Sequence, residues 1–208
     1  MHKEVIRALI PAAGQSKRMH AFKQLLSLGG KTVIETAVNS LLQAGCETAS
    51  VVTGCQTEAV EQVLSAAFGT RVLFVRNEDY AETDMLYSIQ KGLLFLPKCD
   101  AFFLLPGDMP FVTPRTFECL LAERLLHPAP ILLPAYQGTP VHPPLIDASL
   151  IPEICSFSDS GGLRAFFERK KDEIRIVPVS DPESGIDLDT PEDYEQAMNA
   201  FVKHIQKE

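Results

Sequence analysis

A short run of small and basic residues at positions 8–19 carries the first chemical signal in the sequence. It reads ALIPAAGQSKRM, so an apolar start is followed by Pro-Ala-Ala-Gly and then by two adjacent cations. Small side chains let backbone N–H groups close around an anion, and Lys17 and Arg18 can add charge-assisted hydrogen bonds to a polyphosphate. Lys23 follows shortly after. The pattern indicates a polyphosphate site, with an ordinary solvated loop as the alternative.

Three known motifs do not fit this loop. The dinucleotide-binding fingerprint needs three glycines, but Gly14 stands alone. The GGKT run at 29–32 resembles the end of a P-loop, yet Leu25 stands where the first glycine of that motif would fall. A serine-hydrolase elbow around Ser16 would require glycine in place of Arg18. The loop therefore belongs to none of these three classes of site.

Acidic residues at two distant places could complete a site for a metal-bound polyphosphate. Asp108 follows an apolar run in FLLPGDMP, where the neighbouring prolines and glycine fix its direction. Asp187 and Asp189 are two residues apart in SGIDLDTPEDY, so their side chains point the same way if the chain is extended. Carboxylates gathered at strand ends suit Mg²⁺, which shares its ligand shell with phosphates. Asp189 is also open to interpretation as the cap of the last helix.

The spacing of apolar residues predicts the helices and strands that must position these motifs. Strand-like runs alternate with helical spacing along most of the chain. This alternation predicts an α/β fold with a mostly parallel sheet covered on both faces, and ligands at the carboxyl ends of its strands. Strands are expected at 4–10, 48–54, 71–77, 101–108 and 174–179, and helices at 31–45, 57–69, 84–96, 114–126, 161–171 and 190–206.

Residues 130–146 depart from this alternation. The run PILLPAYQGTPVHPPLI contains two short extended pieces around a Gly-Thr-Pro turn, and its prolines predict an edge strand or a lid. Helix ends are marked more clearly. Gly45 and Gly69 are expected to stop helices, Pro114 to lie in a first turn, and Thr190 to cap the closing helix.

Length and composition limit the class of protein. The chain has 208 residues, of which 46% are hydrophobic and 22% charged, so we expect a soluble protein with a single domain over residues 1–208. With no apolar run that could span a bilayer and no secretory signal, a cytoplasmic location is expected. The net charge of -8 predicts no nucleic-acid or membrane partner. Five widely spaced cysteines indicate neither a disulfide framework nor a zinc site.

Taken together, the motifs resemble those of the MobA/MocA-type nucleotidyltransferases over nearly the whole chain. The matching segments are PAAGQSKRM with Lys23, LPGDMPFV and IDLDTPEDY. Two further segments, NEDYAETDMLYSIQKGL at 77–93 and VHPPLI at 141–146, also resemble segments of the family. The first motif is shared with sugar-nucleotide pyrophosphorylases and with the cytidylyltransferase of isoprenoid synthesis. The middle segments point to the molybdopterin branch.

The resemblance implies a GT-A-like α/β/α fold and an in-line phosphoryl transfer. The terminal phosphate of molybdopterin would attack the α-phosphorus of CTP or GTP, and pyrophosphate would leave. Because family members with Ala-Ala-Gly in the loop tend to use CTP, the PAAG run favours cytidine. The implied cofactor is Mg²⁺. The implied partners are a nucleoside triphosphate, a phosphorylated acceptor such as molybdopterin, and a molybdoenzyme or its chaperone.

The resemblance also assigns roles to individual residues. Arg18 would neutralise the leaving pyrophosphate and Lys23 the α-phosphate, with Asp108 as the third catalytic residue. Asp108 and Asp187 would hold Mg²⁺. The expected nucleotide-binding residues are Pro11, Ala12, Ala13, Gly14, Ser16, Arg18, Lys23 and Asn77, and the expected acceptor-binding residues are Met85, Ser88, His142, Gly161 and Gly162.

Several alternatives stay open on the acceptor side. Asp84 and Val141 stand where the family has glycine, in two segments expected to face the acceptor. His142 can also be interpreted as a packed loop residue, and the turn at 161–162 as a plain helix start. The acceptor could instead be a sugar phosphate or another phosphorylated metabolite. A non-catalytic nucleotide- or cofactor-binding module is the third alternative.

Overall fold

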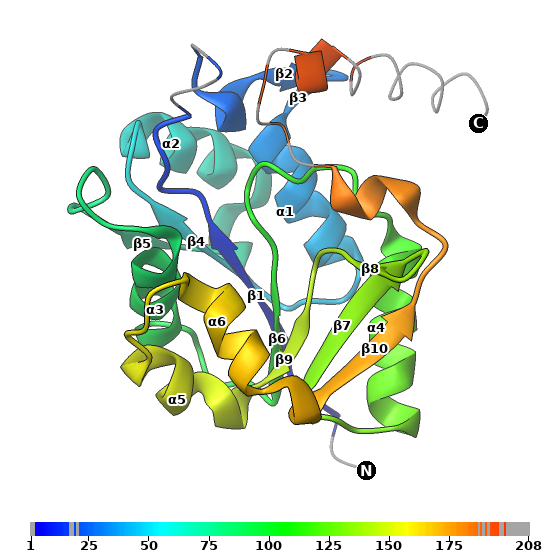
Figure 1. The fold of residues 1–208 in the computed structure, drawn as a ribbon. Coiled ribbons are helices and arrows are strands. Elements are labelled where there is room, and N and C mark those ends of the chain that lie inside the picture. Colours follow the sequence, from blue (N-terminus) through cyan, green and yellow to red (C-terminus); the bar gives the residue numbers. More distant parts are fainter. Residues whose placement is uncertain are drawn as a thin grey trace.

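The computed structural model describes residues 3–16, 19, 21–186, 188, 190, 192–195 and 198. An eight-stranded sheet in the order β10-β7-β9-β6-β1-β4-β5, with β8 paired to β7, forms its centre (Figure 1). Only β8 and β9 pair antiparallel to their neighbours in this sheet. The strands are β1 (Ile6–Pro11), β4 (Ala49–Thr53), β5 (Val72–Arg76), β6 (Ala101–Leu104), β7 (Ile131–Tyr136), β8 (Thr139–Pro140), β9 (Leu145–Asp147) and β10 (Ile174–Pro178).

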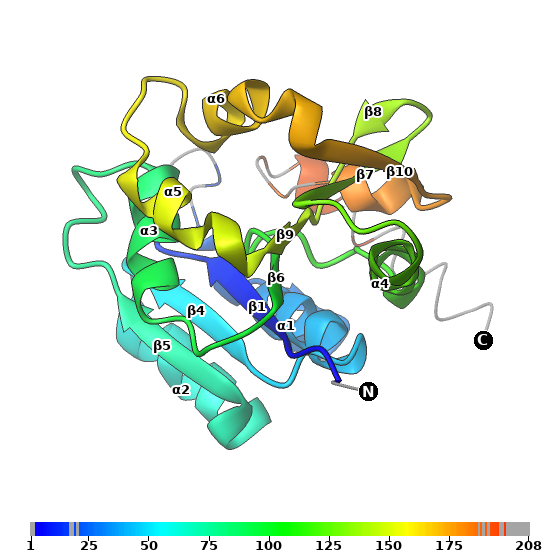
Figure 2. The same ribbon diagram turned by 90° about the horizontal axis from the view of Figure 1, so that it is seen from below.

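Helices cover both faces of the sheet (Figure 2). One face carries α1 (Val33–Gln43), α2 (Thr57–Phe68) and α4 (Pro114–Leu126), and the other carries α3 (Met85–Leu94), α5 (Ile151–Ser156) and α6 (Gly162–Arg169). Each face has its own apolar core, because the central strands are buried on both sides. The predicted three-layer α/β/α fold with a mostly parallel sheet is therefore confirmed.

Local sequence explains where the main helices begin and end. Thr32 and Glu35 form a reciprocal capping box at the start of α1, and Gly45 with φ 98° follows its end. Asp84, which stands where the resemblance expects glycine, caps α3 by accepting a hydrogen bond from Tyr87 N at 2.9 Å. The predicted boundaries of these helices are correct to within about two residues.

The prediction of an edge strand or a lid at 130–146 is wrong. Both β7 and β9 lie inside the sheet, with β9 between β6 and β7. Pro134 is tolerated in β7 because the β9 ladder reaches only Ile131 and Leu132, so the proline nitrogen lies beyond it. The Pro134 carbonyl instead accepts a hydrogen bond from Val141 N.

Some elements have no counterpart among the sequence predictions. They are α5, the hairpin of β2 (Ser27–Leu28) and β3 (Lys31–Thr32), and the 3-10 turns. The GGKT run forms this hairpin, with Gly29 and Gly30 at positive φ, so it is a strand turn and not a phosphate loop. The 3-10 turns are η2 (Lys23–Leu25), η3 (Gly69–Arg71), η4 (Ala148–Leu150), η5 (Lys171–Glu173) and η6 (Pro182–Gly185).

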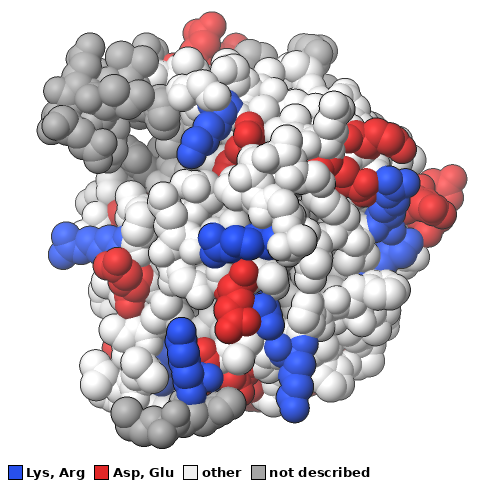
Figure 3. Space-filling view, turned by 180° about the vertical axis from the view of Figure 1, so that it is seen from behind, with Lys and Arg blue, Asp and Glu red and all other residues white. Residues whose placement is uncertain are grey.

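The remaining features concern the surface and the chain end. On the face carrying α1, α2 and α4, acidic and basic side chains are interspersed (Figure 3). Among the described residues, no helix has the length and apolar character needed to cross a membrane. Thr190 and Asp193 exchange capping hydrogen bonds, as expected for an N-cap at Thr190, but most of the predicted closing helix lies outside the described residues.

Candidate active site

Loops at the carboxyl ends of β1, β5 and β6 surround a small cavity. Its volume is about 260 Å³. Because these three strands run parallel in the sheet, their carboxyl ends lie at the same edge, and segments far apart in the sequence meet there, as expected for an α/β fold. The lining residues are Pro11, Ala12, Ala13, Gly14, Ser16, Lys23, Gln24, Tyr80, Thr83, Asp84, Met85, Ser88 and Asp108.

The loop after β1 lines this cavity and contains backbone donors that have no acceptor in the described part of the chain. Ala12 N donates to Val52 O at 2.9 Å, which extends the sheet to the start of the loop. The next three N–H groups, of Ala13, Gly14 and Gln15, donate to no acceptor within the described residues. Successive N–H groups without an internal acceptor form a concave anion site. The loop is thus suited to a phosphate group.

Ser16 connects this loop to the turn that carries Lys23. Its hydroxyl donates to Gln24 Oε1 at 3.1 Å and accepts from Lys23 N at 3.2 Å. Ser16 itself has φ 51°, a left-handed conformation in which the chain reverses. Although Ser16 lines the cavity, its hydroxyl is engaged within the protein. Its clearest structural effect is to position η2.

Lys23 and Asp108 form an ion pair at the cavity wall. Lys23 Nζ contacts Asp108 Oδ2, and the two side chains are only 12% and 14% exposed. A half-enclosed pair of this kind is less screened than a surface pair. The structure therefore brings together the predicted lysine and the predicted metal-binding carboxylate.

The segment that follows β10 also reaches Asp108. Asp181 anchors it to the start of α4, since its buried carboxylate accepts hydrogen bonds from Thr113 and Thr116. Further along, Leu188 N donates to the backbone carbonyl of Asp108 at 3.3 Å. Leu188 therefore lies beside Asp108. Lys17, Arg18, Asp187 and Asp189 lie outside the described residues, and their assigned roles stay predictions.

The described residues at this wall fit a divalent cation that also binds phosphates. No three histidine, cysteine or carboxylate side chains gather at one point in the described part of the chain. Mg²⁺ usually takes one or two carboxylates and completes its shell with phosphate oxygens and water. The ammonium group of Lys23 already places a positive charge against Asp108. The role of Asp108 as a metal ligand stays a prediction.

Asn77 has a different place from the one expected. It is buried and lies outside the cavity lining, and its amide nitrogen donates to Thr83 Oγ1 at 3.1 Å and Ser88 Oγ at 3.0 Å. Its amide oxygen accepts from Asp79 N. Asn77 therefore holds the 77–84 loop against α3, and its contact with the nucleotide stays a prediction.

Four residues of the lining were not among the predicted site residues. They are Gln24, Tyr80, Thr83 and Asp84. The sequence carried a signal for Asp84, because an acid immediately before an apolar helix is typical of an N-cap. Nothing in the sequence marks the other three, since Tyr80 and Thr83 depend on the fold of the 77–84 loop and Gln24 on the position of η2.

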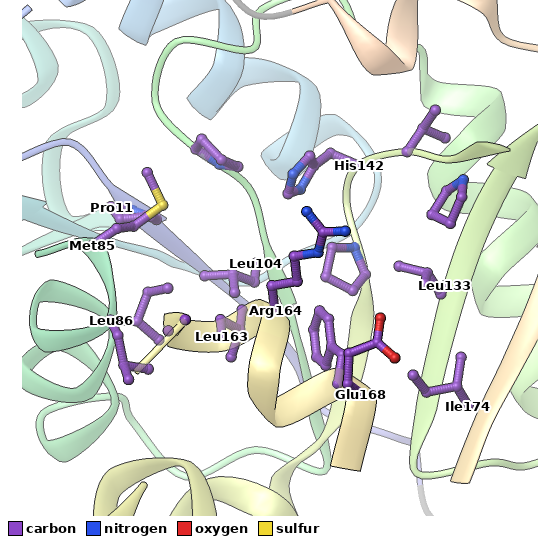
Figure 4. A pocket seen from close by; sticks show the side chains of 18 of the residues that line it. Pro11, Met85, Leu86, Leu104, Leu133, His142, Leu163, Arg164, Glu168 and Ile174 are labelled. Carbon is purple, nitrogen blue, oxygen red and sulfur yellow. The ribbon is translucent and has the colours of Figure 1, made fainter. Parts of the chain in front are cut away.

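A second, larger cavity of about 1030 Å³ adjoins the first (Figure 4). The two cavities share Pro11, Asp84 and Met85, so they lie side by side at the start of α3. The walls of the larger one are mainly apolar side chains from β6, β7, β10 and α6. It is lined by four of the predicted acceptor residues, Met85, His142, Gly161 and Gly162, whereas Ser88 lines the smaller cavity.

His142 lies close to both parts of the site. Burial lowers the pKa of its imidazole, and the nearby charge of Asp108 acts in the opposite direction. Its Nδ1 atom is buried and has no hydrogen-bond partner among the described residues. The imidazole is therefore neutral near pH 7 and retains a ring nitrogen for a further hydrogen bond.

Comparisons with known proteins agree with this geometry. The sequence is 26% identical to the molybdenum cofactor cytidylyltransferase of Escherichia coli K12, over 95% of this chain and 98% of that protein. It is 28% identical to the nicotine blue oxidoreductase of Paenarthrobacter nicotinovorans, over 90% and 93% of the two chains. Among solved structures, a nucleotidyl transferase from Methanothermobacter thermautotroptrophicus superposes with a TM-score of 0.81 at 26% identity, covering 96% of this chain and 99% of that one.

The fold, the phosphate-suited loop and the Lys23–Asp108 pair define a nucleotidyltransferase. Residues 8–174 match the family described as the MobA-like NTP transferase domain, and the chain belongs to that family. Proteins of this family transfer nucleotides from nucleoside triphosphates and typically use a divalent metal ion.

Proposed function

We propose that the protein transfers CMP from CTP to molybdopterin, or to a close phosphorylated relative of it, in a reaction that depends on Mg²⁺. The observation that carries this proposal is the placement of the Lys23–Asp108 pair between a phosphate-suited loop and a large second cavity. The similarity to the E. coli cytidylyltransferase over almost the full length of both chains supports the nucleotide and the acceptor.

The chemistry follows from where the residues lie. An oxygen of the acceptor's phosphate attacks the α-phosphorus of the nucleotide, a new P–O bond forms, and the bond to the β-phosphate oxygen breaks to release pyrophosphate. The N–H groups of residues 13–15 bind the phosphates, and Lys23 neutralises charge at the α-phosphate. When bound beside Asp108, Mg²⁺ supplies further neutralisation of the triphosphate. Asp187 or Asp189 is its second proposed ligand.

The size of the second cavity favours a large acceptor. Its volume is about four times that of the first, and it is lined largely by leucine, isoleucine, proline and phenylalanine side chains. A sugar phosphate would leave most of this apolar surface in contact with water, whereas a fused ring system would bury it. Molybdopterin or a similar heterocyclic phosphate therefore suits this cavity better.

The proposal is tested by measuring pyrophosphate release by the purified protein. Each nucleoside triphosphate is supplied with molybdopterin and Mg²⁺, and a sugar phosphate serves as the competing acceptor. We expect release with CTP and molybdopterin. Asp108→Asn and Lys23→Gln should each lower turnover at least about 100-fold, because charge stabilisation in the transition state is lost.

The outcomes separate the three alternatives. Turnover with the sugar phosphate and not with molybdopterin would contradict the proposed acceptor. If CTP with Mg²⁺ raises the melting temperature but no nucleotide is transferred to any acceptor, the protein is a binding module. In that case Asp108→Asn would retain the function of the wild type. Asp172→Asn, at an exposed position away from both cavities, is the control.

A further inference from the structure

The larger cavity contains a cation that the known features of the site leave unexplained. Arg164 lies on the first turn of α6 and lines this cavity. In Figure 4 its side chain extends from α6 into the cavity, toward the side that His142 lines. Within the described part of the chain, the guanidinium group makes no ion pair or hydrogen bond.

The nearest candidate partner on the same helix does not neutralise it. Glu168 is one turn further along α6 and also lines the cavity, yet the two side chains form no ion pair. Figure 4 shows the Glu168 carboxylate turned toward the end of the cavity at Leu133 and Ile174. Among the described residues, the exposed side chain of Arg164 therefore borders a largely apolar cavity without a counter-ion.

A guanidinium group in such a place is suited to a bound anion. Its planar array of N–H donors matches the oxygens of a phosphate or carboxylate, which it can bind through two parallel hydrogen bonds. The backbone supports this position. Gly161 and Gly162 turn the chain at φ 104° and 62°, and a Cβ built on Gly162 would lie 3.9 Å from Leu86 Cβ, so the start of α6 lies next to α3. Arg164 is thus held over the cavity close to the start of α3.

We propose that Arg164 binds the phosphate monoester of the acceptor and directs it toward the nucleotide. The two cavities lie side by side at Pro11, Asp84 and Met85, so a phosphate held on the His142 side of the larger cavity lies next to the nucleotide site. This inference rests on the proposed function, because the acceptor phosphate is the attacking group. It adds a residue that selects phosphorylated acceptors over unphosphorylated ones.

The first experiment is kinetic and uses variants of two arginines on the same helix. Arg164→Gln should raise the KM for molybdopterin about 10- to 100-fold and leave the KM for CTP within twofold, because a charge-assisted hydrogen bond to the acceptor alone is lost. Arg164→Lys should raise the KM for molybdopterin less than Arg164→Gln does, because lysine keeps the positive charge. Arg169→Gln is the matched control, since Arg169 pairs with Asp159 and stacks on Phe157 outside both cavities.

The second experiment does not need turnover. Crystals of the wild type and of Arg164→Gln are soaked in tungstate, whose scattering locates an oxyanion. We expect tungstate at Arg164 in the wild type and none there in the variant. Tungstate bound only elsewhere, or an unchanged acceptor KM in Arg164→Gln, would overturn the inference. If no acceptor is turned over but tungstate binds at Arg164, the anion site stands and the proposed reaction fails.

Discussion

At the scale of single residues, Gly14 and Gly54 differ in whether the fold itself leaves space for a side chain. At Gly54 a Cβ would lie 2.7 Å from Tyr80 Cβ and 2.8 Å from the carbonyl oxygen of Ala13, so the fold itself excludes a side chain. At Gly14 a Cβ would meet nothing within 4 Å, and φ is not positive. Gly14 is therefore not required by the protein alone, which leaves the close approach of a ligand as the reason.

This difference predicts opposite effects for two alanine substitutions. Gly14→Ala should keep the free energy of unfolding or raise it by up to about 1 kcal/mol, because the unfolded chain loses entropy. The same variant should weaken CTP binding about tenfold, since its methyl group would stand at the N–H groups that bind phosphate. Gly54→Ala should instead lower the free energy of unfolding by about 1–3 kcal/mol.

Urea unfolding and calorimetric titration with CTP and Mg²⁺ measure the two quantities separately. An unchanged affinity in Gly14→Ala would show that the loop after β1 does not bind the nucleotide.

The sequence predicted the main charges of the site but not how they are held. Asp108 was predicted at the site because it follows an apolar strand, and Lys23 because it follows the basic loop and the resemblance assigns it to the α-phosphate. The hydroxyl of Ser16 and the amide of Asn77 were assigned to the nucleotide, yet both are engaged in hydrogen bonds within the protein. Residue type shows that a side chain can form a hydrogen bond. The choice of partner depends on tertiary structure.

At the scale of elements, periodicity identified most helices and strands, and long-range pairing determined the rest. Strands such as β1 and helices such as α1 are encoded by their own apolar spacing. The central place of β9 is different, because a three-residue strand carries little local signal and is fixed by its pairing with β6 and β7. Helix α5 has only six residues, too few to show a clear period.

After β10 the chain contacts the rest of the protein at two points, Asp181 and Leu188. At the first point Asp181 is only 5% exposed and accepts hydrogen bonds from the backbone and hydroxyl of Thr113 and from the hydroxyl of Thr116. It thereby caps α4 from a distant part of the chain. At the second point Leu188 is hydrogen-bonded to Asp108. This part of the chain therefore connects the start of α4 to the wall of the candidate site.

We therefore expect Asp181→Ala to affect both stability and activity. Removing the carboxylate leaves three donors without their acceptor, which should lower the free energy of unfolding by about 2–4 kcal/mol. The KM for CTP should rise several-fold, because the part of the chain beside Asp108 loses its anchor. Urea unfolding and steady-state kinetics below the melting temperature measure these effects, with Asp172→Ala as the exposed control. A loss of stability with an unchanged KM would contradict this connection.

At the scale of the whole molecule, the candidate site and a stabilising network around Arg124 lie at opposite edges of the sheet. The smaller cavity lies at the carboxyl edge, and the larger one extends from there along the sheet to Ile174 at the start of β10. At the amino edge, Arg124 of α4 is buried and joins Glu4 before β1, the carbonyl of Asp100 before β6, and Asp147 at the end of β9. A buried arginine with several acceptors stabilises a fold only when all of them are present, because an unpaired charge is costly to bury. This network closes the edge opposite to the site.

The last prediction concerns the dependence of this network on pH. Although burial raises the pKa of Asp147, hydrogen bonds from Ser149 and Arg124 outweigh it and hold the pKa below the ordinary value of 3.8. A carboxylate with a lowered pKa in the folded state stabilises the protein above its unfolded pKa, and this contribution is lost as the pH falls through the folded pKa. Asp147→Asn should therefore be less stable than the wild type by about 1–2 kcal/mol at pH 7. The difference should hold down to about pH 5 and shrink progressively below pH 4.

Urea unfolding at several pH values tests this prediction, and Asp159→Asn, which alters the exposed pair with Arg169, should cost less than about 0.5 kcal/mol at pH 7. CTP affinity should stay unchanged in Asp147→Asn, because the network and the nucleotide site lie at opposite edges of the sheet. If the stability difference persisted at pH 3, the Asp147 effect would come from packing and not from its charge. If CTP affinity fell as well, the two edges would be coupled, and stability and binding could not be assigned to separate ends of the strands.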